Sequence, residues 1–159
     1  MSGWTRAVRS AVPGGMLAGV VTSSAAALGG RQQTGSAVAA LNAPSHIVHG
    51  EDPARVERPT AGHTLVGLLV NTAATLFWAT VFEKALDSIE GRHKPSAIWA
   101  TAAGTAAAAY VTDYHLVPRK LRPGYERRAT GPALLGIYAA LALSLGVAAS
   151  MRRGWVARR

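Results

Sequence analysis

Histidine and acidic side chains stand at several places in the chain where they could supply the ligands of a metal centre. The five candidates lie at or between the ends of apolar stretches: they are His46, His49, His63, Asp113 and His115. Neutral imidazoles with a carboxylate suit zinc or another divalent metal, and histidine also ligates haem. Glu51 and Asp52 would add oxygen ligands. The pattern therefore indicates a metal or haem site on one face of the protein.

A plainer interpretation accounts for the same five residues. Their spacing does not fix them on one helix, as an HExxH pattern would. Histidines at a membrane surface can instead hydrogen-bond to loop backbone and lipid headgroups. The chain has no cysteine, so disulfides, thiolate metal sites and a Cys nucleophile are excluded. We predict no resident cofactor and keep a divalent metal or haem as the alternative.

The elements that must position these residues follow from the distribution of charge. Charged residues make up 16% of the chain and fall at its two ends and in three internal stretches. Four uncharged windows are left between them, at residues 10–30, 59–82, 95–112 and 129–151. About 20 helical residues cross a hydrocarbon core of ~30 Å, so every window is long enough, the third only barely.

We therefore expect an all-α protein, a four-helix transmembrane bundle forming a single membrane domain over residues 1–159. The expected spans are residues 11–30, 63–83, 95–113 and 130–151. The first window consists largely of Ala, Gly and Val and also carries parts of a signal peptide. We interpret it as a retained helix. Between the first two spans, residues 35–41 predict a short helix on the membrane surface or a re-entrant piece.

The net charge of +9 does not indicate a nucleic-acid partner. Nucleic-acid binders spread Lys and Arg over a solvated face with aromatic rings that stack on bases. Here arginines flank apolar segments, as the pairs Arg6/Arg9, Arg127/Arg128 and Arg152/Arg153 do. Such pairs suit anionic lipid headgroups. The partners that we expect are the lipid bilayer, its anionic headgroups, and further copies or a larger membrane complex.

Small and hydrogen-bonding residues indicate where the helices pack. His63, Gly67, Asn71, Thr75 and Trp78 follow one face of the second span. Glycines also recur in the other three spans, and small residues let transmembrane helices approach closely. The residues that we expect to pack, within the chain or between copies, are Gly15, Gly19, Gly67, Asn71, Gly104 and Gly136.

Asp113 ends the third span, where a negative charge opposes the helix dipole. We expect a salt bridge to Arg119, Lys120 or Arg122 to compensate it. No span contains a mid-membrane Asp, Glu, Lys or Arg, the usual mark of a proton or ion pathway. No catalytic triad or phosphate-binding Gly loop is found, and we do not predict an enzyme.

The numbers of Lys and Arg residues on the two sides of the membrane hardly indicate which side is cytoplasmic. The side that holds both termini gathers nine of them and the opposite side eight. The positive-inside rule needs a larger asymmetry. We expect both termini in the cytoplasm, with dual topology as the alternative.

Four stretches resemble small hypothetical inner-membrane proteins of proteobacteria. They lie in residues 40–126 and comprise residues 42–46, 63–67, 77–79 with 82–83, and 113–118. The resemblance implies a multi-pass protein of the cell inner membrane and carries over no functional residue. Three functions stay open: a structural or accessory membrane subunit, a metal- or haem-associated protein, and a small homo-oligomeric transporter.

Overall fold

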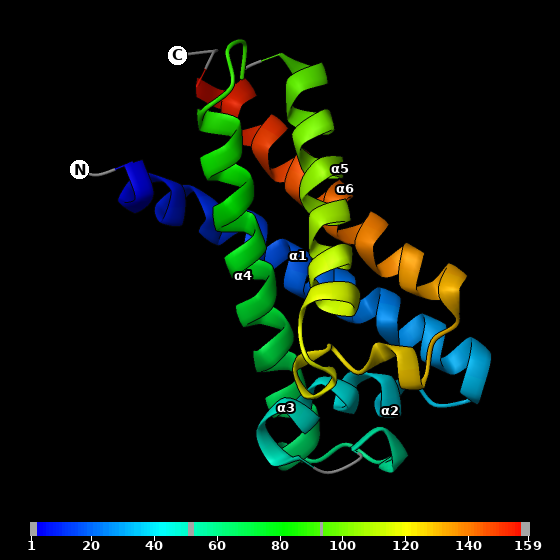
Figure 1. Ribbon diagram of the computed structural model, residues 1–159. Helices are drawn as coiled ribbons and strands as arrows, with labels where there is room; N and C mark the ends of the chain where they lie inside the picture. The colour runs from blue at the N-terminus through cyan, green and yellow to red at the C-terminus, as the bar shows by residue number, and fades with distance from the viewer. Residues whose placement is uncertain (1–2, 51–52, 93, 157–159) are drawn as a thin grey trace.

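A computed structural model describes residues 3–50, 53–92 and 94–156, and within these ranges every regular element is a helix and none is a β-strand (Figure 1). Short 3₁₀ and π-helical turns join the longer helices. The α-helices are α1 (Gly3–Thr34), α2 (Ala37–Asn42), α3 (His46–His49), α4 (Val66–Asp87), α5 (Pro95–Val111) and α6 (Gly131–Val156). The all-α expectation is confirmed for the described residues.

Three helices are long and apolar enough to cross a membrane. They are Gly3–Thr34, Ala61–Asp87 and Gly131–Arg152. The second of these combines a π-helical turn, Ala61–Leu65, with α4. The fourth expected span, α5, has 17 residues and is continued by a π-helical turn, Thr112–Leu116. By length and composition, three of the four expected spans are therefore present as membrane-length helices.

Helix α1 lies against both α4 and α6, and small residues make these contacts close. Its buried face is almost free of large side chains and consists of Ala7, Ala11, Gly14, Gly15, Ala18, Gly19, Thr22, Ser23, Ala26, Gly29 and Gly30. The helix begins eight residues earlier than the sequence predicts, because Arg6 and Arg9 stay exposed on its first turns.

Many large apolar side chains are exposed, and several polar side chains are buried. Val20, Leu69 and Leu143 are more than half exposed. Asn42 and Ser45 are fully buried. A water-soluble protein would bury the former and expose the latter. The surface of this protein therefore suits an apolar solvent.

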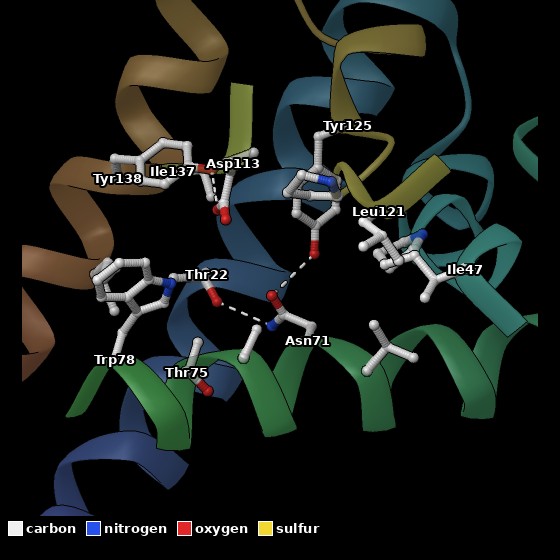
Figure 2. A pocket seen from close by; sticks show the side chains of 15 residues that line it. Thr22, Ile47, Asn71, Thr75, Trp78, Asp113, Leu121, Tyr125, Ile137 and Tyr138 are labelled. Atoms are coloured by element: carbon white, nitrogen blue, oxygen red, sulfur yellow. Dashed lines mark hydrogen bonds between the residues drawn. The ribbon is translucent and has the colours of Figure 1, made fainter. Parts of the chain in front are cut away.

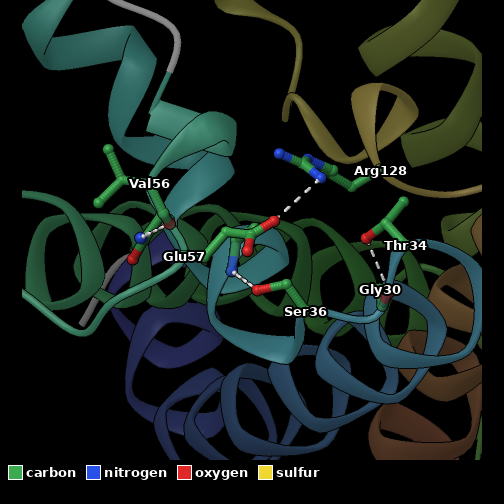
Figure 3. Close-up of polar contacts among 8 residues, drawn as sticks. Gly30, Thr34, Ser36, Val56, Glu57 and Arg128 are labelled. Carbon is green, nitrogen blue, oxygen red and sulfur yellow. Dashed lines mark hydrogen bonds and ion pairs between the residues drawn. The ribbon is translucent and has the colours of Figure 1, made fainter.

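The corner between α1 and α4 is formed by α2, close to the short helix expected over residues 35–41. Ser36 caps α2, its hydroxyl accepting a hydrogen bond from the Ala39 N–H at 3.2 Å (Figure 3). Gly67 of α4 lies against the Leu41 carbonyl of α2, and an added Cβ would overlap that oxygen. Glycine is therefore required for α2 to reach α4.

Ion pairs join segments that are distant in sequence at both ends of the bundle. Arg128 lies 3.7 Å from Glu57 near the α2 corner (Figure 3), where Glu57 is exposed and the pair stabilises little. At the other end of the bundle, Arg152 of α6 lies 2.5 Å from Glu83 of α4. The same guanidinium donates to the Ser10 carbonyl of α1 at 2.7 Å. Arg152 therefore joins three helices.

Candidate functional site

The three described histidines of the α2–α4 connection make their contacts within that connection. His46 is buried, and its Nδ1 lies 2.8 Å from the Ala43 carbonyl oxygen, while its Nε2 has no hydrogen-bond partner. The Nε2 of His49 lies 2.7 Å from the Gly62 carbonyl oxygen. The rings of His49 and His63 meet edge to face with centroids 5.5 Å apart.

Asp113 and His115 point to different surroundings, although they are two residues apart. The Asp113 carboxylate accepts a hydrogen bond from the Tyr138 hydroxyl of α6 at 2.6 Å. His115 is exposed and its ring lies beside Tyr110, with centroids 5.8 Å apart. The π-helical turn Thr112–Leu116 directs the carboxylate toward α6 and leaves the imidazole outside.

The predicted ligand set therefore does not assemble. Over residues 3–50, 53–92 and 94–156, no three His, Asp or Glu side chains lie close enough together to hold a metal ion. Glu51 and Asp52, which the sequence offered as further ligands, lie outside the described residues. The backbone carbonyls that bind His46 and His49 are the physical reason, because each holds its ring beside its own loop.

The expected salt bridge of Asp113 is replaced by a neutral contact. Its partner is a phenol on α6, and no described Lys or Arg nitrogen lies within 4 Å of its carboxylate. Arg119 and Lys120 are exposed. The predicted partners lie in the loop that follows Asp113, whereas its carboxylate faces α6.

Asn71, near the middle of α4, is the centre of a buried hydrogen-bond network. Its Nδ2 lies 3.1 Å from the Gly19 carbonyl oxygen and 3.0 Å from the hydroxyl oxygens of both Thr22 and Ser23 on α1. Its Oδ1 accepts a hydrogen bond from the Tyr125 hydroxyl at 3.1 Å. One amide thus connects α4 to α1 and to the segment between α5 and α6.

That segment, residues 117–130, closes one end of the bundle, and we call it the roof loop. Tyr125 is 4% exposed. Gly124 before it has φ +84°, and an added Cβ would lie 2.9 Å from His46 Nδ1 and 3.0 Å from the Ala43 carbonyl oxygen. Glycine therefore allows the roof loop to pack on the α2–α3 connection, and this contact directs Tyr125 inward.

Burial raises the pKa of the Tyr125 phenol well above its ordinary value, and the nearby Asp113 carboxylate raises it further. The phenol is accordingly neutral at physiological pH and can donate its proton to Asn71. The roof loop is thus held by a hydrogen bond that does not depend on pH in the physiological range.

An open cavity, which we call the interior cleft, lies beside this network (Figure 2). Its volume is about 100 Å³. In Figure 2, Asn71 and Thr75 lie on α4, and Tyr125 of the roof loop extends toward Asn71. Asp113 and Tyr138 lie next to each other, across the cleft from Asn71. Ala74 and Leu121, both exposed, also line the cleft and mark its mouth. Sequence reasoning missed the cleft and its Tyr125 and Tyr138.

Four of the six residues expected to pack do lie between helices. An added Cβ at Gly15 would come within 2.7 Å of Leu76, and one at Gly19 within 3.2 Å of the Thr72 and Thr75 hydroxyls. Gly67 contacts α2, and Asn71 contacts α1, as described above. Gly104 and Gly136 are exposed, with nothing within 4 Å of an added Cβ. For these two, close packing stays a prediction about contacts between copies or with another protein.

Comparison with protein-family models, with curated proteins and with solved structures gave no match.

Proposed function

We propose that this chain is an integral membrane protein that crosses the bilayer four times and acts as a structural or accessory subunit through helix packing. The distribution of its side chains supports the membrane location. Exposed Leu, Val, Phe and Met side chains cover α1, α4 and α6, and a cluster of buried Asn, Thr and Ser side chains lies between α1 and α4. In lipid, apolar side chains outside and hydrogen bonds between helices are both favourable.

The fourth crossing is α5 with the π-helical turn that continues it. Helix α5 supplies 17 residues, about 26 Å at 1.5 Å per residue, and the π-helical turn adds five more residues. The two together are close to the ~30 Å of a hydrocarbon core. Four crossings put both termini on one side, which we assign to the cytoplasm of a bacterial cell.

Helix α5 carries the subunit proposal, because its exposed face is unlike those of α1 and α4. On α5 the exposed residues include Ala103, Gly104 and Ala107, and Gly136 and Ala139 of α6 are exposed as well. The exposed positions of α1 and α4 are more often large, such as Leu69 and Phe77, although Ala73 and Ala74 of α4 are exposed as well. Small residues on a transmembrane face let another helix approach closely.

The mass of the purified protein in a neutral detergent, measured by light scattering after size exclusion, tests the subunit role. We expect a defined oligomer, and Gly104→Leu should shift it to the monomer. The substitution lies on an exposed face, and Leu has the higher helix propensity, so the fold should persist. Ala73→Leu, at an exposed position of α4, is the matched control and should leave the mass unchanged.

A monomeric mass for the unaltered protein would leave association with a different subunit, which cross-linking in native membranes through a cysteine at position 107 would detect. A wild-type monomer without any cross-link would contradict the subunit proposal. The absence of native cysteine makes such single-cysteine variants clean probes.

The crossings are tested with two further single-cysteine variants. Glu90→Cys lies in the turn between α4 and α5, and Lys120→Cys lies in the roof loop; both positions are exposed. A membrane-impermeant maleimide added to spheroplasts should label position 120 and not position 90. Labelling of both positions from the same side would exclude α5 as a crossing.

A further inference from the structure

The interior cleft presents one carboxyl group to whatever enters it. Of the fifteen described residues that line it, Asp113 is the one with an acidic or basic side chain. Its described partner is the Tyr138 phenol at 2.6 Å, which donates a hydrogen bond but brings no positive charge. The cleft therefore holds a carboxylate for which the described residues provide no neighbouring cation.

The amide and hydroxyl groups of Asn71, Thr22 and Thr75, which also line the cleft, are already engaged with the protein. Asn71 uses both its amide nitrogen and its oxygen. The Thr22 hydroxyl donates to the Ala18 carbonyl at 2.7 Å, and the Thr75 hydroxyl donates to the Gly15 carbonyl at 3.0 Å. A ligand would therefore find its principal polar contact at Asp113.

Aromatic rings and aliphatic side chains form the remaining wall. The rings of Trp78, Tyr125 and Tyr138 line the same cleft as the carboxylate, and Figure 2 shows Trp78 and Tyr138 on the same side of it. Aromatic faces attract cations, most strongly where water is excluded. The other lining residues are largely aliphatic and include Val70, Ile137 and Leu141. This combination suits a positive charge that carries apolar substituents.

We propose that the interior cleft binds a small organic monocation, a protonated or quaternary amine with apolar groups, which pairs with Asp113 and lies against the ring of Trp78. A divalent metal is a poorer occupant, because such ions require several oxygen or nitrogen ligands and the cleft supplies one carboxylate. The inference is independent of the subunit role, since α5 and α6 can pack on another chain whether or not the cleft is filled.

Equilibrium binding of radiolabelled benzylamine to the full-length protein in neutral detergent tests this proposal. The amine is protonated at neutral pH and matches the required chemistry. We expect saturable binding, and competition by unlabelled benzylamine at least about tenfold stronger than by benzyl alcohol, its uncharged counterpart, a difference of about 1.4 kcal/mol. Equal competition by the alcohol, or no saturable binding of the amine, would overturn the proposal.

Asp113→Asn keeps the hydrogen-bond acceptor for Tyr138 and removes the charge, so it should weaken benzylamine binding by at least about tenfold. Glu90→Gln is the matched control, because it removes one negative charge from the exposed turn between α4 and α5, outside the cleft. Unchanged affinity in Asp113→Asn would contradict the proposal.

A second pair of variants separates binding from folding. Trp78→Leu removes a ring that lines the cleft, while Phe77→Leu removes its exposed neighbour, which does not line it. Binding should fall for Trp78→Leu and persist for Phe77→Leu, with similar thermal unfolding midpoints. Equal benzylamine binding by both variants would show that Trp78 is not part of the binding site.

Discussion

Two carboxylates on the helices of this protein lie in contrasting environments. Glu83 is 4% exposed and meets the Arg152 guanidinium at 2.5 Å, near the end of the bundle that holds the termini. Asp113 lies at the opposite end and meets the Tyr138 phenol. Glu83 has its countercharge within the protein, whereas among the described residues Asp113 has a neutral partner and borders a cleft.

This difference in environment suggests different roles for the two carboxylates: Glu83 holds the fold together, and Asp113 is available to a ligand. A buried ion pair adds little net stability to a fold, but removing one of its partners is costly because it leaves a buried charge without a countercharge. Arg152 also donates to the α1 backbone, so the pair at Glu83 connects three helices. Asp113 makes one described hydrogen bond, to a side chain that the fold could retain without it. We therefore expect loss of the first charge to affect stability and loss of the second to affect binding.

Arg152→Ala should give the largest loss of stability. It removes the guanidinium that lies 2.5 Å from the buried Glu83 carboxylate and the hydrogen bond to Ser10, at a cost of about 3 kcal/mol. Denaturant unfolding in detergent micelles, followed by circular dichroism, would measure the loss. Arg92→Ala, in the exposed turn between α4 and α5, is the control. A loss no larger than that of Arg92→Ala would show that the ion pair does not stabilise the bundle.

Asn71→Ala should follow, with a loss of about 2 kcal/mol. The substitution removes an amide that four groups contact, although each hydrogen bond between transmembrane helices contributes about 0.6 kcal/mol on average. Tyr125 would also lose its acceptor, so proteolysis of the roof loop should become faster. Thr72→Val, whose hydroxyl bonds within its own helix, should change neither quantity. Unaltered proteolysis of Asn71→Ala would show that the network does not hold the roof loop.

Tyr138→Phe should have a smaller effect, below about 1.5 kcal/mol, because one hydrogen bond is lost and the ring is kept. Its more informative consequence is on Asp113, which would then lack its described partner while still lining the cleft. We expect benzylamine binding to persist in this variant. Complete loss of binding, with stability retained, would assign the polar contact with the ligand to the phenol and not to the carboxylate.

The sequence predicts a large part of the fold because the bilayer imposes a simple rule on it. Three of the four uncharged windows correspond to membrane-length helices. The i, i+4 spacing on the second window also placed Gly67, Asn71 and Thr75 on one face, and in the structure all three are buried. Such periodicity indicates which residues share one face of a helix, whichever helix packs against that face.

Contacts between distant segments could not be predicted in the same way. Asp113 and Tyr138 are 25 residues apart, and their contact depends on how α5 packs on α6. Tyr125 reaches Asn71 because Gly124 adopts a positive φ and packs on His46, which no spacing reveals. The sequence indicates only on which side of the membrane each histidine lies, and not which of them are close in space. Local carbonyl contacts then keep His46 and His49 apart from Asp113 and His115.

The contrast between the two carboxylates is tested most directly by measuring stability and benzylamine affinity together in Glu83→Gln and Asp113→Asn. Both substitutions remove one negative charge and keep the shape of the side chain. We predict that Glu83→Gln lowers the unfolding free energy and leaves the affinity intact, while Asp113→Asn leaves the unfolding free energy nearly intact and weakens binding at least about tenfold. Equal loss of stability in both, with affinity unchanged in both, would contradict the account.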